Sequence, residues 1–276
     1  GDLGTGAVGC AGALEQVAPV LHGLLVQLLG LHSPNEATIA AVLSPPWATA
    51  LGWLRWAPHT AADDPLDDGV RLADTAERAE RLVAALEELV ERRLVARRAV
   101  AAVDDAGSIL AAPPGGRVPI PAVVVLVSHD APGDAARLIR LAERGPAAGV
   151  LLIWLGRRTT ELPAACRTVI EVDEHGTGAV SRLAAAERIA PVRLETLTGV
   201  EAEGFARSIA PLVDAATVVE DAGLPPRVML AELLDRGMLV EPEPEAVRSR
   251  WREHAPTGGA PEAARGLRAV VGVADD

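Results

Sequence analysis

Two overlapping glycine patterns near the start of the chain could bind phosphate groups. Residues 4–9, GTGAVG, match the GxGxxG pattern of dinucleotide-binding folds, and residues 4–11, GTGAVGCA, match most of the P-loop frame GxxxxGK[ST]. The dinucleotide pattern needs a strand before its first glycine, and only GDL precedes it here. It also needs an acid for the ribose about 20 residues further on, where residues 29–34 contain no Asp or Glu. The sequence therefore disfavours a dinucleotide site.

The P-loop frame suits its surroundings better, because a helical pattern begins just after Gly9. However, Cys10 occupies the position of the lysine that reaches the β- and γ-phosphates, and Ala11 that of the hydroxyl that holds Mg²⁺. The chain contains no lysine, so no shift of the frame supplies one. We predict a degenerate nucleotide site at Gly9, Cys10, Ala11 and Gly12, whose glycines form either a plain turn or a weak anion site of backbone N–H groups.

A second part of this site is predicted at the end of the apolar run 122–127, AVVVLV. In ATPases a strand of this kind ends in an Asp that orients Mg²⁺. Here Ser128 and His129 separate Asp130 from the run and Ala131 follows it, so a catalytic base is absent. Asp130 either lies where open α/β sheets bind ligands or caps the next turn. We assign Asp130 to the degenerate site and expect no catalytic residue.

Neither metal nor disulfide chemistry is indicated. Cys10 and Cys166 are far apart and form no CxxC pair, and the histidines show no metal-ligand spacing. We expect no metal site and no cofactor for this domain, in a reducing compartment.

A tryptophan cluster is the other unusual feature, since aromatic residues make up only 2% of the chain. Trp47, Trp53 and Trp56 lie in PPWATALGWLRWAPH at 45–59, for which we expect a helix, and Trp53 and Trp56 would share one face of it. Such residues either pack in a core or anchor an interface. Trp53, Trp56 and His59 are our candidate interface residues.

Short apolar runs alternate with helical patterns, which predicts an α/β fold with a mostly parallel sheet flanked by helices. The β-branched run at 122–127 is typical of a strand covered on both faces. Asp134 is expected to cap the helix that follows. We expect strands at about 6–8, 38–43, 70–74, 121–130, 149–156 and 168–172, and helices at about 13–31, 45–59, 75–100 and 134–144, with further helices from residue 198 onward.

Bulk composition restricts the partners. The chain has 276 residues, 49% of them apolar, which is enough for a large core. Its formal charge of -12 gives no support to nucleic-acid binding. The runs AVVVLV and VLLIWL are too short to cross a membrane, so we expect no direct membrane insertion. The chain starts without Met and ends in a strand-like LRAVVGVADD, from which we expect a fragment of a longer protein.

Three segments resemble one family. LHSPNEATIAAVLS at 31–44, WLRWAPH at 53–59 and LRAVVGVADD at 267–276 are similar to segments of the EccC subunit of actinobacterial type VII (ESX) secretion systems, which belongs to the FtsK/SpoIIIE ATPases. The second segment is similar to a WDWxKWLPH-like box of that family, although Leu51 and Gly52 replace its first Trp-Asp pair. The part that matches is the domain between the membrane stalk and the first full ATPase module.

The resemblance implies a RecA-like (P-loop NTPase-type) fold, with a degenerate ATPase-like domain at 1–222 and a helical linker and strand at 223–276 leading into the next ATPase module. It implies a non-catalytic coupling and assembly domain, which links the membrane-anchored part of a secretion motor to its ATP-hydrolysing modules. ATP and Mg²⁺ belong to the parent family, whose protein is an ATPase, and neither is expected in this domain. The alternative is an active domain that binds and hydrolyses ATP at its own divergent site.

The same resemblance implies the partners and the location. The expected partners are adjacent ATPase modules of the same chain, neighbouring motor subunits and other subunits of the secretion membrane complex. The expected location is the cytoplasmic face of the cell membrane.

Overall fold

The structure, a computed structural model, describes residues 6–60, 66, 71–105, 121–174, 177–212 and 248. Apart from residue 248, these residues belong to a compact unit that spans Gly1–Asp214. The helical linker and strand predicted at 223–276 lie outside the described residues, again apart from residue 248. The domain boundary at residue 222 stays a prediction.

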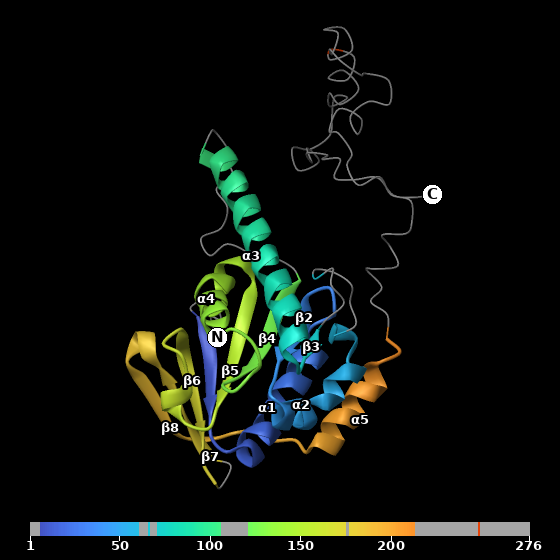
Figure 1. Cartoon of the computed structure of the whole chain (residues 1–276), viewed down its shortest axis with the longest axis vertical. Helices are drawn as coiled ribbons and strands as arrows, with labels where there is room; N and C mark the ends of the chain where they lie inside the picture. Colours follow the sequence, from blue (N-terminus) through green and yellow to red (C-terminus); the bar gives the residue numbers. More distant parts are fainter. Residues whose placement is uncertain are drawn as a thin grey trace, which may run out of the picture. The chain divides into compact units, whose positions relative to one another are not determined.

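The unit is built on an eight-stranded sheet with the order β3-β2-β4-β5-β1-β6-β7-β8 (Figure 1). Neighbouring strands from β3 to β6 in this order are parallel, and β7 and β8 extend the sheet as an antiparallel hairpin. The strands are β1 (Ala7–Ala11), β2 (Ala37–Val42), β3 (Leu72–Ala73), β4 (Ala122–Ser128), β5 (Val150–Gly156), β6 (Cys166–Val172), β7 (Thr177–Arg182) and β8 (Glu187–Arg193).

Helices cover both faces of the sheet (Figure 1). On one face, α1, α2 and α5 enclose a core that includes Leu21, Ile39 and Leu126. On the other face, α3 and α4 enclose a second core that includes Leu86 and Val125. The helices are α1 (Leu14–Leu31), α2 (Pro45–Ala50), α3 (Ala76–Asp105), α4 (Ala135–Arg144) and α5 (Gly199–Ile209).

Strand β4 confirms the expectation of a strand covered on both faces. It pairs with β2 on one side and β5 on the other, with Val124 opposite Ile39 and Leu151. Every residue from Val123 to Ser128 is buried. The unbroken apolar run follows from this position, because side chains on both faces of the strand meet helices.

Helix α1 is long and apolar enough to cross a membrane by length and composition. In this fold it packs between the sheet and α5, and Val17, Leu21 and Leu25 are buried there. Its apolar character is therefore accounted for by core packing.

Most of the expected elements are confirmed. The structure contains strands β2 to β6 and helices α1, α3, α4 and α5 close to the predicted positions. Asp134 caps α4 as expected, since its Oδ1 accepts a hydrogen bond from the backbone N–H of Ala136 at 2.8 Å.

Three predictions of local structure were wrong or incomplete. The first strand runs over Ala7–Ala11 and not over 6–8, so it ends three residues later than expected. The helix predicted at 45–59 is broken into α2 and two short 3-10 helices, η2 (Gly52–Trp56) and η3 (Pro58–Thr60), since Gly52 and Pro58 each disfavour a continuous α-helix. The β7–β8 hairpin was not predicted.

Candidate functional site

A cleft of about 560 Å³ lies at the carboxyl edge of the parallel strands. Residues directly after β1, β4 and β5 line it, together with the first turns of α1 and α2; those that matter below are Glu15, Trp47, His129, Asp130 and Arg157. α1 follows β1 on one face of the sheet, whereas α4 follows β4 on the opposite face. Open α/β sheets bind ligands where connections diverge in this way. The cleft is therefore the ligand position that the fold itself defines.

The connection from β1 to α1 has only two residues, Gly12 and Ala13. A P-loop instead places the long segment GxxxxGK[ST] between strand and helix, so that backbone N–H groups surround the phosphates. Gly9, Cys10 and Ala11 continue strand β1, where they pair with β5 and β6. Of the two glycines that we expected in the turn, Gly9 lies in the strand instead, and only Gly12 lies in the turn. Within the described residues, no loop at this position could enclose a phosphate.

Gly12 makes the turn. Its φ is +154°, and a Cβ at this position would lie 2.8 Å from the carbonyl oxygen of Val172. Its N–H donates to the carbonyl of Gly156 at 3.1 Å, which joins the ends of β1 and β5. The next N–H, that of Ala13, donates to Oε1 of Gln16 at 3.2 Å. The backbone donors of the short connection are thus used inside the fold.

The charges in the cleft also differ from those of a phosphate site. Glu15 lies in the first turn of α1 and lines the cleft. The positive end of the helix dipole therefore already faces a carboxylate, which repels phosphate. Asp130 adds a second negative charge and Arg157 a positive one. Within the described part of the chain, none of these three side chains forms an ion pair.

Ser128 is the last residue of β4, where an ATPase strand carries its Mg²⁺-orienting Asp. Its side chain is buried, and its Oγ accepts a hydrogen bond from the backbone N–H of Ser44 at 2.8 Å. This bond ties β4 to the residue that caps α2. His129 and Asp130 follow, both exposed and both lining the cleft. The structure thus places Asp130 at the predicted edge of the sheet, in a loop beyond the strand end.

The loop after β5 is held in place by Glu161. The backbone N–H of Arg157 donates to Oε2 of Glu161 at 2.8 Å. This bond is the main reason why the pKa of Glu161 is lowered, and the nearby His129 acts in the same direction. The carboxylate positions the loop from which Arg157 enters the cleft wall.

Both cysteines are buried thiols on adjacent strands, β1 and β6. Burial raises the pKa of Cys10 to about 12, and a smaller contribution comes from Cys166. Burial also raises the pKa of Cys166 to about 11. A thiol that stays protonated is a poor nucleophile. Cys10 is buried in the core on the α1 side of the sheet and is not among the residues that line the cleft.

The tryptophan-containing segment lies beside α1 and α5. Trp53 is 5% exposed and belongs to the core beneath these helices. Trp56 is half-buried, and the guanidinium of Arg207 on α5 lies 3.9 Å from its ring centroid. Trp53 is thus in the core, and Trp56 is partly covered by the chain itself.

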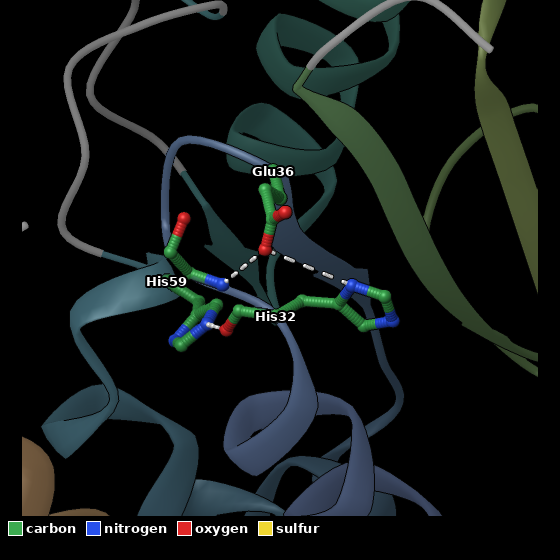
Figure 2. Close-up of polar contacts among 4 residues, drawn as sticks. His32, Glu36 and His59 are labelled. Carbon is green, nitrogen blue, oxygen red and sulfur yellow. Dashed lines mark hydrogen bonds and ion pairs between the residues drawn. The ribbon is translucent and has the colours of Figure 1, made fainter. Parts of the chain in front are cut away.

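His59 is also buried, with 2% of its surface exposed. Figure 2 shows its ring beside the turn that contains His32 and Glu36. Glu36 organises that turn, since its Oε2 accepts a hydrogen bond from the backbone N–H of Ser33 at 2.9 Å. His59 is therefore a structural residue of this chain and not an exposed interface residue.

Sequence reasoning missed the contribution of Glu15, and it did not assign Trp47 or Arg157 to the cleft. The signal was available for Arg157, which directly follows the apolar run of β5. Glu15 could be placed only once the strand end at Ala11 was known. Among the described residues, no group of three or more His, Cys, Asp or Glu side chains is placed to hold a metal ion.

No protein-family model matches the chain, and no curated protein matches it. Among solved structures, EssC (ATPases 2 and 3) from Geobacillus thermodenitrificans is similar with a TM-score of 0.54 at 15% identity, over 85% of this chain and 49% of that chain. Thermomonospora curvata EccC (ATPases 2 and 3) in complex with a signal sequence peptide gives a TM-score of 0.46 at 18% identity, over 75% and 42% of the two chains. The chain thus spans about half the length, or less, of these structures.

The mostly parallel sheet, covered by helices on both faces, is similar to the fold of EssC (ATPases 2 and 3). The predicted fold class is confirmed. The sequence segments resemble EccC, and the structure is similar to EssC in its fold. At this identity the similarity concerns the fold, so what the cleft can do depends on its own residues.

Proposed function

We propose that this chain is a non-catalytic coupling and assembly domain of a type VII secretion motor ATPase. The observation that carries the proposal is the two-residue connection between β1 and α1. A domain with an ATPase-like fold but no P-loop keeps the sheet and helices of an ATPase module. It lacks the loop that binds the phosphates of the nucleotide.

The chemistry of the cleft supports the same conclusion. Phosphoryl transfer depends on positive charge around the phosphates and on a bound Mg²⁺. Here the chain has no lysine, and Glu15 places a carboxylate at the helix N-terminus. Ser128 stands in place of the Mg²⁺-orienting acid and is engaged by Ser44. These features disfavour tight binding of Mg²⁺ and ATP.

A domain with an ATPase fold and no hydrolysis can transmit movement or organise assembly. EssC carries more than one ATPase module in a single chain, as the solved form with ATPases 2 and 3 illustrates. We propose adjacent ATPase modules of the same chain as the first partners, with neighbouring motor subunits and other subunits of the secretion complex as further partners. The proposed location is the cytoplasmic face of the cell membrane.

The competing function is ATP hydrolysis at this domain's own cleft. The volume of the cleft favours it, as do Asp130 and Arg157, which line the cleft and form no ion pair among the described residues. In that case Asp130 would orient Mg²⁺ and Arg157 would contact phosphate.

Phosphate release from ATP separates the two functions. The 276-residue chain is incubated with ATP and Mg²⁺, beside the variants Asp130→Ala and Glu174→Ala, the second of which removes an exposed acid that does not line the cleft. We expect no turnover above that of the buffer for all three proteins. Turnover by the wild type and by Glu174→Ala that disappears in Asp130→Ala would establish the competing function.

A further inference from the structure

The cleft at the carboxyl edge of the sheet carries charged groups from three separate elements. Glu15 comes from the first turn of α1, Asp130 from the loop after β4 and Arg157 from the loop after β5. All three residues are exposed, and their side chains form no ion pair with another described residue. Their charges are therefore available to a ligand that enters the cleft.

The balance of these charges favours a cationic ligand. Two carboxylates lie in the wall beside one guanidinium, and His129 is the remaining titratable side chain there. The backbone donors that could attract an anion are occupied, since the N–H of Gly12 donates to the carbonyl of Gly156 and that of Ala13 to the side chain of Gln16. An anion would meet two like charges in the cleft, whereas a cation meets two opposite ones.

Trp47 also lines the cleft, and it indicates which kind of cation fits. Tryptophan is the side chain that attracts organic cations most strongly, and the planar guanidinium group stacks well on aromatic rings. A guanidinium also forms paired hydrogen bonds with a carboxylate. A bare metal ion needs several ligands at once, and the described residues contain no group of three or more His, Cys, Asp or Glu side chains placed to supply them.

The rest of the wall suits an alkyl chain attached to the guanidinium. Leu14, Pro46 and Leu155 are apolar residues of the same cleft. Long cationic side chains place their methylene groups along such surfaces and keep the charged end among polar groups. The volume of about 560 Å³ lies within the range of sites for small organic ligands.

We infer that the cleft is a binding site for an alkylguanidinium group, which Glu15 and Asp130 hold beside Trp47. Such a group belongs either to an arginine side chain of a partner protein or to a free small molecule. The inference rests on the proposed function, because a cleft that binds ATP is occupied by the nucleotide. Arg157 carries the same charge as the ligand and weakens its binding.

Nuclear magnetic resonance of the 276-residue chain at pH 8, where histidine side chains are ordinarily uncharged, tests this inference. The signals that report on the cleft are the indole N–H of Trp47 and the backbone N–H groups of residues 129–130 and 156–157. The probes are agmatine, a tripeptide with arginine between two glycines and blocked ends, and the same tripeptide with uncharged citrulline in place of arginine.

We expect saturable shifts of these signals with agmatine, with a Kd of about 1 mM or lower, and none with the citrulline peptide. Equal binding of the arginine peptide would assign the cleft to an arginine of a partner protein, and binding of agmatine alone would assign it to a free small molecule. Equal shifts with the citrulline peptide, equal shifts with Mg²⁺ alone, or no shift with any probe would overturn the inference.

Variants of the wall give a second test with predictions of opposite sign. Glu15→Gln and Asp130→Asn should each weaken agmatine binding about fivefold, because each removes a charged acceptor. Arg157→Gln should strengthen it about twofold, because it removes a like charge. The matched control Glu174→Gln, which changes an exposed acid outside the cleft, should leave the Kd unchanged. An unchanged Kd in both cleft variants that lose a carboxylate would overturn the inference.

Titration of the same sample with ATP and Mg²⁺ separates this inference from the proposed function. If neither the guanidinium probes nor ATP shift the signals, the inference is wrong and the proposed function stands. If ATP binds in the cleft and agmatine does not, both are wrong.

Discussion

The ring of His59 donates a hydrogen bond from Nε2 to the backbone carbonyl of His32 across 2.7 Å (Figure 2). His32 caps the C-terminus of α1, and His59 lies in the short helix η3 that follows the tryptophan-containing segment. The bond therefore joins two of the three segments that carry the resemblance to EccC, 31–44 and 53–59. The two segments are therefore in direct contact in the folded domain.

We expect His59→Ala to lower the free energy of unfolding by about 2 kcal/mol or more, because it removes a buried ring and leaves the carbonyl of His32 without a donor. Urea unfolding measures the loss. The control is His32→Ala, which keeps the backbone carbonyl that accepts the bond and removes only an exposed side chain. Equal losses in the two variants would contradict the assigned contact.

His59 should also make stability depend on pH. Burial is the main cause that lowers the pKa of His59 below its ordinary 6.5, the charge of His32 acts in the same direction, and the backbone bond to His32 opposes both. Below about pH 6.5 the unfolded chain binds this proton and the folded chain does not. The contribution of His59 to stability is therefore complete above that pH and is lost as the pH falls toward the lowered pKa.

Urea titrations at pH 7.5 and pH 5.5 check this dependence. The wild type should lose more stability between the two pH values than His59→Gln, since all other titrating groups are shared by both proteins. A variant that loses as much as the wild type would show that His59 is not kept neutral by burial.

The turn at Gly12 gives a prediction with an internal control. Gly12→Ala should destabilise the fold by about 1–2 kcal/mol, because it combines a positive φ with a Cβ that approaches the carbonyl of Val172. Gly52→Ala is the control, since a Cβ there meets nothing within 4 Å. Thermal unfolding of both variants measures the difference, and similar melting temperatures would contradict the described turn.

The register of β1 can be tested by restoring the lysine of the P-loop frame. Cys10→Lys places an ammonium group in the core, so we expect a loss of more than about 3 kcal/mol and no gain of ATP binding. Cys10→Ala, which keeps a small apolar side chain, should fold normally. A stable Cys10→Lys protein that binds ATP would show that Cys10 faces the cleft after all.

The wild-type thiols provide an independent check of the same register. Both are buried and their pKa values are raised by burial, so a thiol-specific reagent should label them only as fast as the protein opens. Rapid labelling of Cys10 in the folded protein would contradict its place in the core.

The sequence predicted those elements whose pattern is local. The run that forms β4 and the capping residue Asp134 needed no knowledge of the rest of the chain. The end of β1 could not be placed in this way, because nothing in the residues Gly9, Cys10 and Ala11 distinguishes a strand from a glycine-rich loop. Their strand conformation follows from pairing with β5 and β6, which are distant in the sequence.

The β7–β8 hairpin was missed for a related reason. Nearly all of β8 is exposed, so it lacks the apolar alternation that marks a half-buried strand. In the candidate site, some features could be predicted from the local sequence and others depended on the tertiary structure. The absence of lysine and the position of Asp130 were visible in the sequence, whereas the contribution of Glu15 emerged only with the length of the β1–α1 connection.

The central proposal is that this domain does not bind ATP. Calorimetric titration of the 276-residue chain with Mg²⁺ and ATP tests this proposal most directly. We expect no heat of binding at nucleotide concentrations up to about 1 mM, a range that covers the affinities of ordinary ATP-dependent enzymes. Saturable binding in the micromolar range that is lost in Asp130→Ala would contradict the claim.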